Sequence, residues 1–418
     1  SAVKARLLAV EADRIVVAYS GGLDSSVLLH TLAQSSDLGM PLEAVHIDHG
    51  LQGAQLPWRT HIETVTSALG VPLEVIEITL TPAKGESIEA VARQGRYQAL
   101  AGLAGRPLIV LAQHQDDQAE TFLLQLLRGA GPKGLAAMPD AFFIGDHPAM
   151  RPLLAIDREG LSQFAKAMGI EWFDDPSNQD QRFDRNYLRS EVMPTIRARW
   201  PSASTTISRA ASLQAETTGV IAQQATGDSR YVNWDGHSFS ASQCQHLPES
   251  RQRNLVRFLL ATCGLPVPSL RRLTTVIGLL NSNAARGEVC WADVAARRYR
   301  DRVFLELVNP DVPSDFETDV IAGVWIPLPG DLGQICVSGS TLNHGASTVR
   351  FRRGGERVRP YERGPSMPLA RWFQQRGVPP WRRQQLPLVI VDAKVAAVGD
   401  TVFEGFGDLR VTWERPSG

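Results

Sequence analysis

Cysteine is scarce in this sequence and missing from its first half. The four cysteines are Cys244, Cys263, Cys290 and Cys336, so the first 243 residues contain no thiol. They are widely spaced and form no C-x-x-C pair, which argues against a disulfide framework and against a zinc site. Cysteine chemistry is therefore excluded from an active site in the first half of the chain.

Long apolar runs are also missing. No stretch approaches about 18 uninterrupted apolar residues, and the first residues, Ser1 to Lys4, do not open a secretory signal. We therefore expect a cytoplasmic protein that has no membrane partner. Of the 418 residues, 43% are apolar and 21% are charged, as is usual for soluble globular proteins. At about 150 residues per domain, this length predicts two or three domains.

Neither sign of charge dominates the whole chain, because 43 lysines and arginines balance 44 acidic residues. One segment differs: from Arg350 to Arg383 there are ten arginines and two glutamates. Such an excess is typical of a surface that binds a polyanion, although a solvated arginine-rich surface is the alternative. Trp372 and Trp381 lie in the same segment and either stack on bases or belong to the core of a small domain.

The first 150 residues alternate between strand and helix patterns. Predicted strands cover residues 15–19, 42–47, 73–78 and 108–112. Predicted helices cover residues 58–69, 87–103 and 117–127, and a further helix directly follows the first strand. Strand–helix–strand units of this length require parallel pairing. We therefore predict an α/β fold with a doubly wound parallel sheet and a ligand at the carboxyl ends of its strands.

The rest of the chain differs in character. A helix is predicted over residues 158–168, and a helical stretch begins at Arg185 and is interrupted by Pro194. Residues 210–307 have a predominantly helical pattern, in which the clearest helices are 249–262 and 269–280.

A polar, proline-marked segment at residues 309–313 is a candidate linker. Beyond it, glycine, proline and β-branched residues predict a small α+β domain at the end of the chain. The three predicted domains are residues 1–210, 211–310 and 311–418, of which the second is helical.

Residues 20–25, Ser-Gly-Gly-Leu-Asp-Ser, lie between the first predicted strand and a predicted helix. Glycines let the backbone turn sharply and bring its N–H groups against an anion, and a helix N-terminus adds a positive dipole end. This pattern is typical of a phosphate site, although it lacks the lysine of a P-loop kinase. The alternative is an ordinary turn with Asp24 or Ser25 as N-cap. The candidate phosphate-binding residues are Ser20, Gly21, Gly22, Leu23, Asp24 and Ser25.

Two further groups of polar residues follow predicted strands or lie on predicted helices. His46 ends the second strand, in the sequence HIDHGL, and either faces a nucleotide or belongs to a polar turn. Arg93 and Arg96 share one face of the third helix with Glu89 and Tyr97, so the alternative to a substrate role is pairing of glutamate with arginine within the helix.

The segment from His114 to Thr121 follows the fourth strand. Asp117 and Glu120 are three residues apart at a helix start, so they lie on one face and could bind an ammonium group or a magnesium ion. Carboxylates also favour helix N-termini for structural reasons alone. Residues 129–135 then form a glycine-rich loop that contains Lys133.

The S-G-G-x-D-S pattern resembles the signature of the PP-loop ATP pyrophosphatases, which bind ATP and cleave it between the α- and β-phosphates. Later motifs narrow this resemblance: D-P-S-N at 175–178, R-N-Y-L-R at 185–189 and Q-R-G-V-P-P-W at 375–381. With them the chain is similar to the tRNA(Ile)-lysidine synthetase family, through most of residues 15–195 and again near the C-terminus. Two positions depart from the family pattern, Gln113 in place of a histidine and Gln52 in place of an arginine, and neither is assigned a role.

This resemblance implies a PP-loop type of sheet and a carbon–nitrogen ligase. The implied reaction joins free lysine to the wobble cytidine of the isoleucine tRNA with a CAU anticodon, using ATP and Mg²⁺ and giving lysidine, AMP and pyrophosphate. Asp24, Asp117 and Glu120 would be catalytic, and Asp24 would also bind the metal. Asp117 and Glu120 would hold the ammonium group of the incoming lysine, and residues 20–25 with His46 would bind ATP. The implied substrate-binding residues are Arg93, Arg96, Asp117, Glu120, Lys133, Arg185 and Arg189. The alternatives are a PP-loop tRNA thiolase and a non-catalytic RNA-binding protein.

Overall fold

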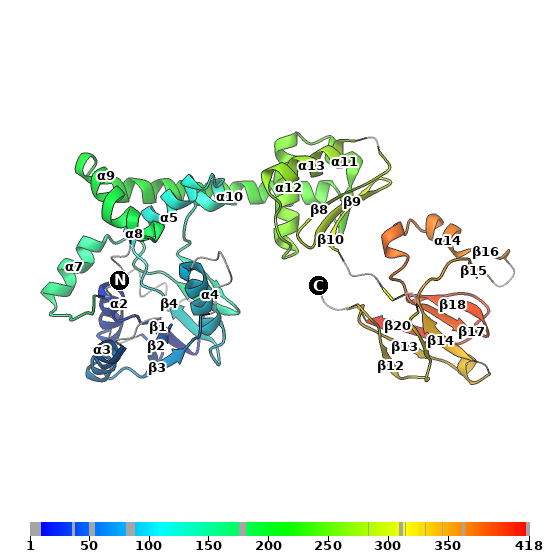
Figure 1. Ribbon diagram of the computed structural model, residues 1–418, viewed down its shortest axis with the longest axis horizontal. Coiled ribbons are helices and arrows are strands. Elements are labelled where there is room, and N and C mark those ends of the chain that lie inside the picture. Colours follow the sequence, from blue (N-terminus) through cyan, green and yellow to red (C-terminus); the bar gives the residue numbers. More distant parts are fainter. Residues whose placement is uncertain are drawn as a thin grey trace. The chain divides into compact units, whose positions relative to one another are not determined.

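The structure is a computed structural model with two compact units, Ser1–Ile221 and Ala222–Gly418 (Figure 1). It describes residues 10–35, 38–49, 55–80, 88–174, 181–282, 284–308, 312–313, 315–330, 332–344, 346–361 and 364–414. Within these residues, no helix is long and apolar enough to cross a membrane.

A six-stranded sheet forms the centre of the first unit. Its strands are β1 (Arg14–Ala18), β2 (Leu42–Asp48), β3 (Leu73–Glu77), β4 (Pro107–Val110), β5 (Ala141–Ile144) and β6 (His147–Met150). They lie in the order β3-β2-β1-β4-β6-β5, and all neighbours are parallel except β5 and β6. The strand order reverses between β1 and β4, which is where doubly wound sheets bind their ligands.

Helices cover both faces of this sheet, which confirms the predicted doubly wound arrangement (Figure 1). The helices are α2 (Leu23–Ala33), α3 (Gln55–Ala68), α4 (Ile88–Ala101), α5 (Gln115–Leu127), α6 (Pro132–Leu135) and α7 (Arg158–Ala167). Successive side chains of β1 point to opposite faces: Ile15 packs with residues of α2, α3 and α7, whereas Val16 packs with residues of α4. Both faces are therefore apolar, and polar side chains collect at the strand ends.

The prediction that Pro194 interrupts a helix was wrong. Three segments follow one another directly: α8 (Asp184–Tyr187), a π-helical turn (Leu188–Val192) and α9 (Met193–Arg199). Pro194 lies in the first turn of α9, where the ring is tolerated because the missing N–H is not needed. Helix α10 (Ala203–Tyr231) then leads from the first unit into the second.

The second unit begins with helices and continues with strands. Helices α11 (Ala241–Gln245), α12 (Glu249–Thr262) and α13 (Leu270–Asn281) agree with the helical prediction for this part of the chain. The sequence did not predict the strands in this part of the chain, because residues 210–307 were expected to be predominantly helical. Strands β7 (Ser238–Ser240), β8 (Arg286–Trp291), β9 (Val294–Tyr299) and β10 (Arg302–Leu307) form an antiparallel sheet.

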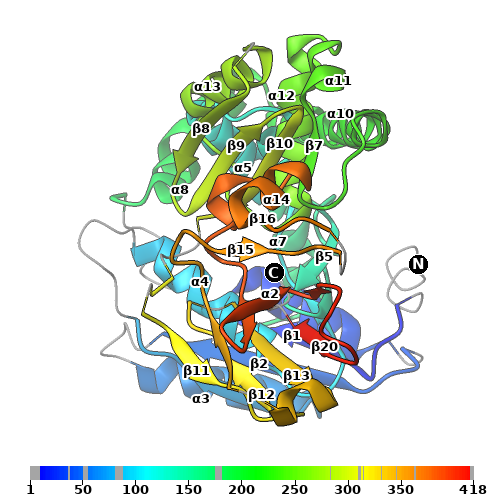
Figure 2. The ribbon, with the colours of Figure 1, turned by 90° about the vertical axis from the view of Figure 1, so that its right-hand side faces the viewer.

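Antiparallel strands dominate the last part of the chain and form the predicted small α+β domain. The strands are β11 (Glu317–Asp319), β12 (Trp325–Pro327), β13 (Gln334–Ser338), β14 (Ser347–Arg350), β15 (Arg357–Val358), β16 (Met367–Pro368), β17 (Leu388–Val391), β18 (Lys394–Val398), β19 (Thr401–Val402) and β20 (Arg410–Glu414). Helix α14 (Leu369–Gln375) packs beside β15 and β16 (Figure 2). Trp372 on this helix is 5% exposed and packs against Phe373 and Phe403, so it belongs to the core.

Candidate active site

The loop after β1 has the geometry of an anion site. Helix α2 begins directly after Gly22, and no side chain caps its N-terminus, so the alternative that Asp24 or Ser25 is the N-cap was wrong. The first N–H groups of a helix have no partner within it and can point at a negative group. The backbone N–H of Ser20 donates to the Ser25 hydroxyl at 3.2 Å, and the two serine hydroxyls lie 3.0 Å apart.

Gly21 holds this loop against α3 in a conformation that favours glycine. Its φ is +79°, and a Cβ atom would lie 2.7 Å from Nε1 of Trp58 and 2.8 Å from Cγ2 of Ile62. The indole of Trp58 in turn donates to the carbonyl of Ser20 at 2.9 Å. Gly22 differs, because a Cβ there would meet no atom closer than 3.6 Å. The close packing of the loop thus depends on Gly21, whereas a methyl group at Gly22 would make only ordinary van der Waals contacts.

We expect Gly21→Ala to destabilise the first unit by about 2–4 kcal/mol, because the left-handed backbone conformation and the clash with Trp58 both cost free energy. Gly22→Ala is the matched control and should unfold within about 1 kcal/mol of the parent chain. Urea unfolding monitored by tryptophan fluorescence measures both. Equal stability of the two variants would contradict the assigned packing role of Gly21.

Asp24 presents a carboxylate oxygen that has no partner. Its Oδ1 is buried and makes no hydrogen bond, and its Oδ2 lies 3.6 Å from Nε2 of His114. Burial raises the pKa of the Asp24 carboxyl, and the nearby imidazole of His114 opposes this shift. Within the described residues no three His, Cys, Asp or Glu side chains are grouped to hold a metal by themselves. Asp24 nevertheless fits Mg²⁺, which proteins commonly bind through one or two carboxylates together with substrate phosphates.

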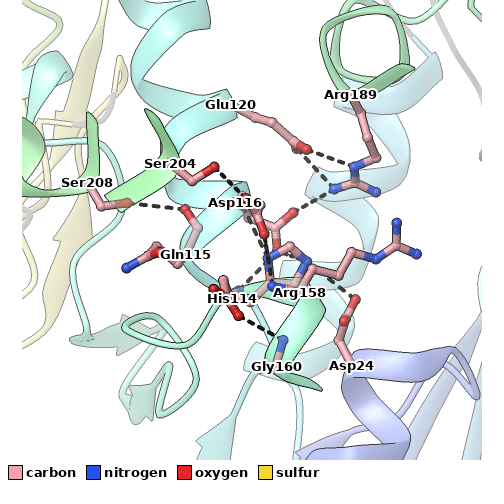
Figure 3. A network of polar contacts seen from close by, with 12 residues as sticks. Asp24, His114, Gln115, Asp116, Glu120, Arg158, Gly160, Arg189, Ser204 and Ser208 are labelled. Atoms are coloured by element: carbon pink, nitrogen blue, oxygen red, sulfur yellow. Dashed lines mark hydrogen bonds and ion pairs between the residues drawn. The ribbon is translucent and has the colours of Figure 1, made fainter. Parts of the chain in front are cut away.

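The N-terminus of α5 faces this loop (Figure 3). The helix starts at Gln115, two residues earlier than predicted, with His114 as N-cap. Nδ1 of His114 accepts from the Asp117 N–H at 3.4 Å, while Oδ2 of Asp117 accepts from the His114 N–H at 3.1 Å. This reciprocal capping box fixes Asp117 in the first turn.

The structure brings together four of the predicted site residues. Arg189 donates to Oδ1 of Asp117 at 2.8 Å and to Oε1 of Glu120 at 2.7 Å, and Nε of Arg185 lies 3.3 Å from Oε2 of Glu120. Glu120 is only 2% exposed. Burial raises the pKa of the Glu120 carboxyl, although Arg189 opposes this shift. Two carboxylates and two guanidinium groups thus form a compact, charge-balanced cluster beside Asp24.

His46 lies at the carboxyl end of β2 with its ring fixed. Its Nδ1 is 2.9 Å from the carbonyl oxygen of Tyr19, and its ring meets that of Trp58 edge-on at 5.0 Å. Burial lowers the pKa of His46, which favours the neutral ring. Because Nδ1 must then donate to the carbonyl, Nε2 is left as an acceptor.

Arg93 and Arg96 each contact a side chain of the first unit. Arg93 donates to the hydroxyl of Tyr97 at 3.2 Å, and Arg96 lies 3.3 Å from Nε2 of His49. Burial lowers the pKa of His49 to about 4, so the neutral ring accepts from Arg96. The side chain of Glu89, the proposed helical partner, lies outside the described residues, as do Gln52 and residues 175–178.

Lys133 is exposed on the short helix α6. Within the described part of the chain, no hydrogen bond or ion pair joins it to the cluster around Asp24.

Sequence comparisons agree with this site. A PP-loop domain model matches residues 2–196, a TilS substrate binding domain matches residues 239–304, and a TilS substrate C-terminal domain matches residues 347–408. The tRNA(Ile)-lysidine synthase of Coxiella burnetii is 36% identical over 412 residues, which cover 95% of this chain and 91% of that protein. This chain belongs to the tRNA(Ile)-lysidine synthase family. Other lysidine synthases are similar: that of Alkalilimnicola ehrlichii is 38% identical (95% and 92% covered) and that of Shigella flexneri 35% (96% of each).

Membership in the lysidine synthase family makes this chain an ATP-dependent ligase. Its PP-loop domain binds ATP, and its substrate is a tRNA.

Sequence reasoning missed an arginine that supports the site. Arg151 is 3% exposed and donates to the side chain of Gln113 at 2.9 Å, to the carbonyl of Pro139 at 2.6 Å and to the hydroxyl of Tyr97 at 3.1 Å. Gln113, which was assigned no role from the sequence, is therefore a partner of Arg151. Nothing in the sequence around Arg151 indicates that its side chain is buried.

Asp116 was missed as well, and it ties α5 to three other helices, α7, α9 and α10 (Figure 3). Its Oδ2 accepts from the Arg158 N–H at the start of α7 at 2.9 Å, and its Oδ1 contacts Arg197 and the hydroxyl of Ser204, which lies on α10. Burial opposes ionisation of Asp116, but the bonds from Ser204 and the Arg158 N–H and the charge of Arg197 lower its pKa overall. The helix that carries Asp117 and Glu120 is thus fixed at its base.

We expect Asp116→Asn to lower the free energy of unfolding at pH 7 by about 1–3 kcal/mol, because it weakens charge-assisted hydrogen bonds. The pKa of Asp116 is lower in the folded chain than in the unfolded one, so its contribution is present above the unfolded value and is lost as the pH falls through the folded value. Urea unfolding at several pH values should show the gap between variant and parent narrowing below about pH 4. A gap that does not change with pH would contradict this account.

Proposed function

We propose that this chain uses ATP to join the ε-amine of free lysine to the wobble cytidine of the isoleucine tRNA with a CAU anticodon, releasing AMP and pyrophosphate. The observation that carries this proposal is the approach of Asp24, in the loop at residues 20–25, to His114 at the N-terminus of α5. The two side chains lie 3.6 Å apart at the point where the strand order reverses. Relatives that match over nine-tenths of both chains carry the name of this activity.

The loop at residues 20–25 would hold the phosphates of ATP. The uncapped start of α2 and the hydroxyls of Ser20 and Ser25 supply donors, and the oxygen of Asp24 that lacks a partner would hold a magnesium ion. Bound there, the metal neutralises charge on the phosphates. His46, with Nε2 as an acceptor, would face the nucleoside of ATP.

The reaction requires no nucleophile from the protein. The carbonyl oxygen of the cytosine attacks the α-phosphorus of ATP, and the bond to pyrophosphate breaks. The adenylated oxygen becomes a leaving group, so the lysine ε-amine attacks the ring carbon, loses a proton and displaces AMP. The lack of thiols among the first 243 residues is consistent with this sequence of steps. Donors aimed at the phosphates stabilise the charge that develops there.

Asp117 and Glu120 are the proposed binding residues for lysine. Their charges are balanced here by Arg185 and Arg189, so an ammonium group would share carboxylate oxygens with these arginines. The amine must become neutral before it attacks, and burial, which raises the pKa of Glu120, favours this carboxylate as the proton acceptor. We propose that Arg93, Arg96, Lys133, Arg185 and Arg189 contact the substrates.

Transfer of labelled lysine tests this function. The full chain is incubated with ATP, Mg²⁺, radiolabelled lysine and a transcript of the isoleucine tRNA that carries the CAU anticodon. We expect label in the tRNA, and none when the wobble cytidine is replaced by uridine. Equal labelling of the cytidine and uridine transcripts would contradict the proposal. Lack of labelling with both transcripts would favour a thiolase or a non-catalytic RNA-binding protein.

The arginine-rich segment divides into paired and exposed side chains. Arg350 pairs with Glu356 at 3.1 Å, Arg353 with Glu317 at 2.9 Å and Arg382 with Glu306 at 2.8 Å. Arg359 and Arg371 are exposed and contact no other described residue through a hydrogen bond or an ion pair. We propose that residues 211–310 and 311–418 form two tRNA-binding domains, in addition to the catalytic domain of residues 1–210, and that Arg359 and Arg371 contact phosphates.

We expect Arg371→Ala to weaken tRNA binding and to reduce the slope of log affinity against log salt by about 0.7–0.9, because one phosphate contact and its released counterion are lost. Arg410→Ala, an exposed arginine of the same domain outside the segment, is the control and should leave the slope unchanged. Filter binding across a salt series measures both. An unchanged slope for Arg371→Ala would support a merely solvated surface.

A further inference from the structure

His114 lies between the loop at residues 20–25, which carries Asp24, and the N-terminus of α5. Its side chain is fully buried, at 0% exposure. Nδ1 accepts the Asp117 N–H, and a ring nitrogen that accepts a hydrogen bond is unprotonated, so the neutral ring carries its proton on Nε2. That Nε2 makes no hydrogen bond in the structure, yet it lies 3.4 Å from Oδ2 of Asp117 and 3.6 Å from Oδ2 of Asp24.

Two buried polar atoms, Oδ1 of Asp24 and Nε2 of His114, therefore lie on neighbouring side chains and have no hydrogen-bond partner. Asp24 accepts no hydrogen bond at Oδ1, and Nε2 of His114 lies 3.6 Å from the other oxygen of the same carboxylate. Two carboxylates this close to one another repel, and a donor between them reduces that repulsion. Such hydrogen bonds are often long without substrate and shorten when it binds. The ring cannot turn away, because the capping box fixes it and protein surrounds it.

We propose that His114 is a positioning residue for ATP, whose Nε2–H holds the Asp24 carboxylate so that Oδ1 faces the phosphates and their magnesium ion. The proposal rests on the proposed function of the same site. It gives His114 two separable tasks: Nδ1 caps α5, and Nε2 orients Asp24. One side chain thereby connects the loop after β1 with the helix after β4, the two strands that flank the reversal of strand order.

Two substitutions separate these tasks. The side-chain oxygen of asparagine reaches the position of Nδ1 and is a favoured N-cap, so His114→Asn keeps the cap and loses the donor to Asp24. The longer amide of glutamine reaches the position of Nε2, so His114→Gln keeps a donor and loses the cap. A purely structural histidine would tolerate asparagine better than glutamine in every assay.

The first measurement is binding of α,β-methylene-ATP with Mg²⁺ to the full-length variants by calorimetry, alongside thermal unfolding. We expect His114→Asn to unfold within about 2 °C of the parent chain and to bind the analogue at least about tenfold more weakly. We expect His114→Gln to unfold several degrees lower but to retain affinity within about threefold. Full affinity of His114→Asn, or equal loss in both variants, would overturn the proposal.

The second measurement concerns turnover. In tRNA-dependent release of pyrophosphate, His114→Asn should raise KM for ATP and the requirement for Mg²⁺ while KM for lysine stays within about twofold. Should His114→Asn not fold, loss of affinity in His114→Gln equal to that in His114→Ala overturns the proposal. Binding of the analogue does not require transfer of lysine, so the two proposals can fail separately. A parent chain that binds the analogue but does not label tRNA would contradict the proposed function. The binding measurements on the His114 variants would then still decide the role of His114.

Discussion

Asp24→Ala is expected to reduce tRNA-dependent release of pyrophosphate by at least about a hundredfold, because it removes the carboxylate proposed to hold the magnesium ion and to organise the phosphates. The fold should survive. Oδ1 of Asp24 bonds to nothing, and burial raises the pKa of the carboxyl, so the folded chain gains little from this charge. Steady-state release of pyrophosphate measures the loss, and urea unfolding shows whether the variant is folded.

Asp146→Ala is the control for this experiment, since Asp146 is exposed in the turn between β5 and β6. It should release pyrophosphate at the parental rate. A folded Asp24→Ala chain with normal release would show that the loop at residues 20–25 does not organise the chemistry.

Glu120→Gln should raise the KM for lysine by about 10- to 100-fold, which corresponds to the loss of one charge-assisted interaction of about 1.5–3 kcal/mol. The KM for ATP should stay within about twofold, because Glu120 contacts Arg185 and Arg189 and has no described contact with the loop at residues 20–25. Titration of lysine at saturating ATP, and of ATP at saturating lysine, separates the two constants.

Glu159→Gln on the exposed start of α7 is the matched control and should change neither constant. Equal increases in both constants for Glu120→Gln would point to a metal-binding role for this carboxylate. They would also move the lysine site away from the Asp117–Glu120 pair.

The sheet of the first unit and the loops at its strand ends could be predicted, because short apolar runs and the polar motifs after them are visible in the sequence. Apolar runs form the buried strands β1, β2 and β4, and the residues that follow β1 and β4 carry the polar motifs. Parallel order then follows from the length of the connections. The strands β8, β9 and β10 were missed because their hairpin turns lack the usual glycine: Ala292 and Arg300 adopt φ values of +43° and +55° instead.

The partners of the site residues could not be read from the sequence. Arg189 lies 72 positions from Asp117 and 69 from Glu120, so only tertiary packing brings these charges together. The inward turn of Arg151 and the donor of His114 are likewise invisible in a linear pattern. The net excess of arginines near the C-terminus was visible, but Glu306 and Glu317, which lie outside that segment, neutralise part of it.

The most direct test of the central claim is to follow pyrophosphate and AMP separately in one reaction with the CAU transcript, with and without lysine. The account predicts that release of pyrophosphate requires the tRNA, because the cytidine oxygen attacks ATP, and that release of AMP requires lysine as well, because the amine displaces it. Pyrophosphate released without tRNA, or AMP released at the same rate without lysine, would contradict the account.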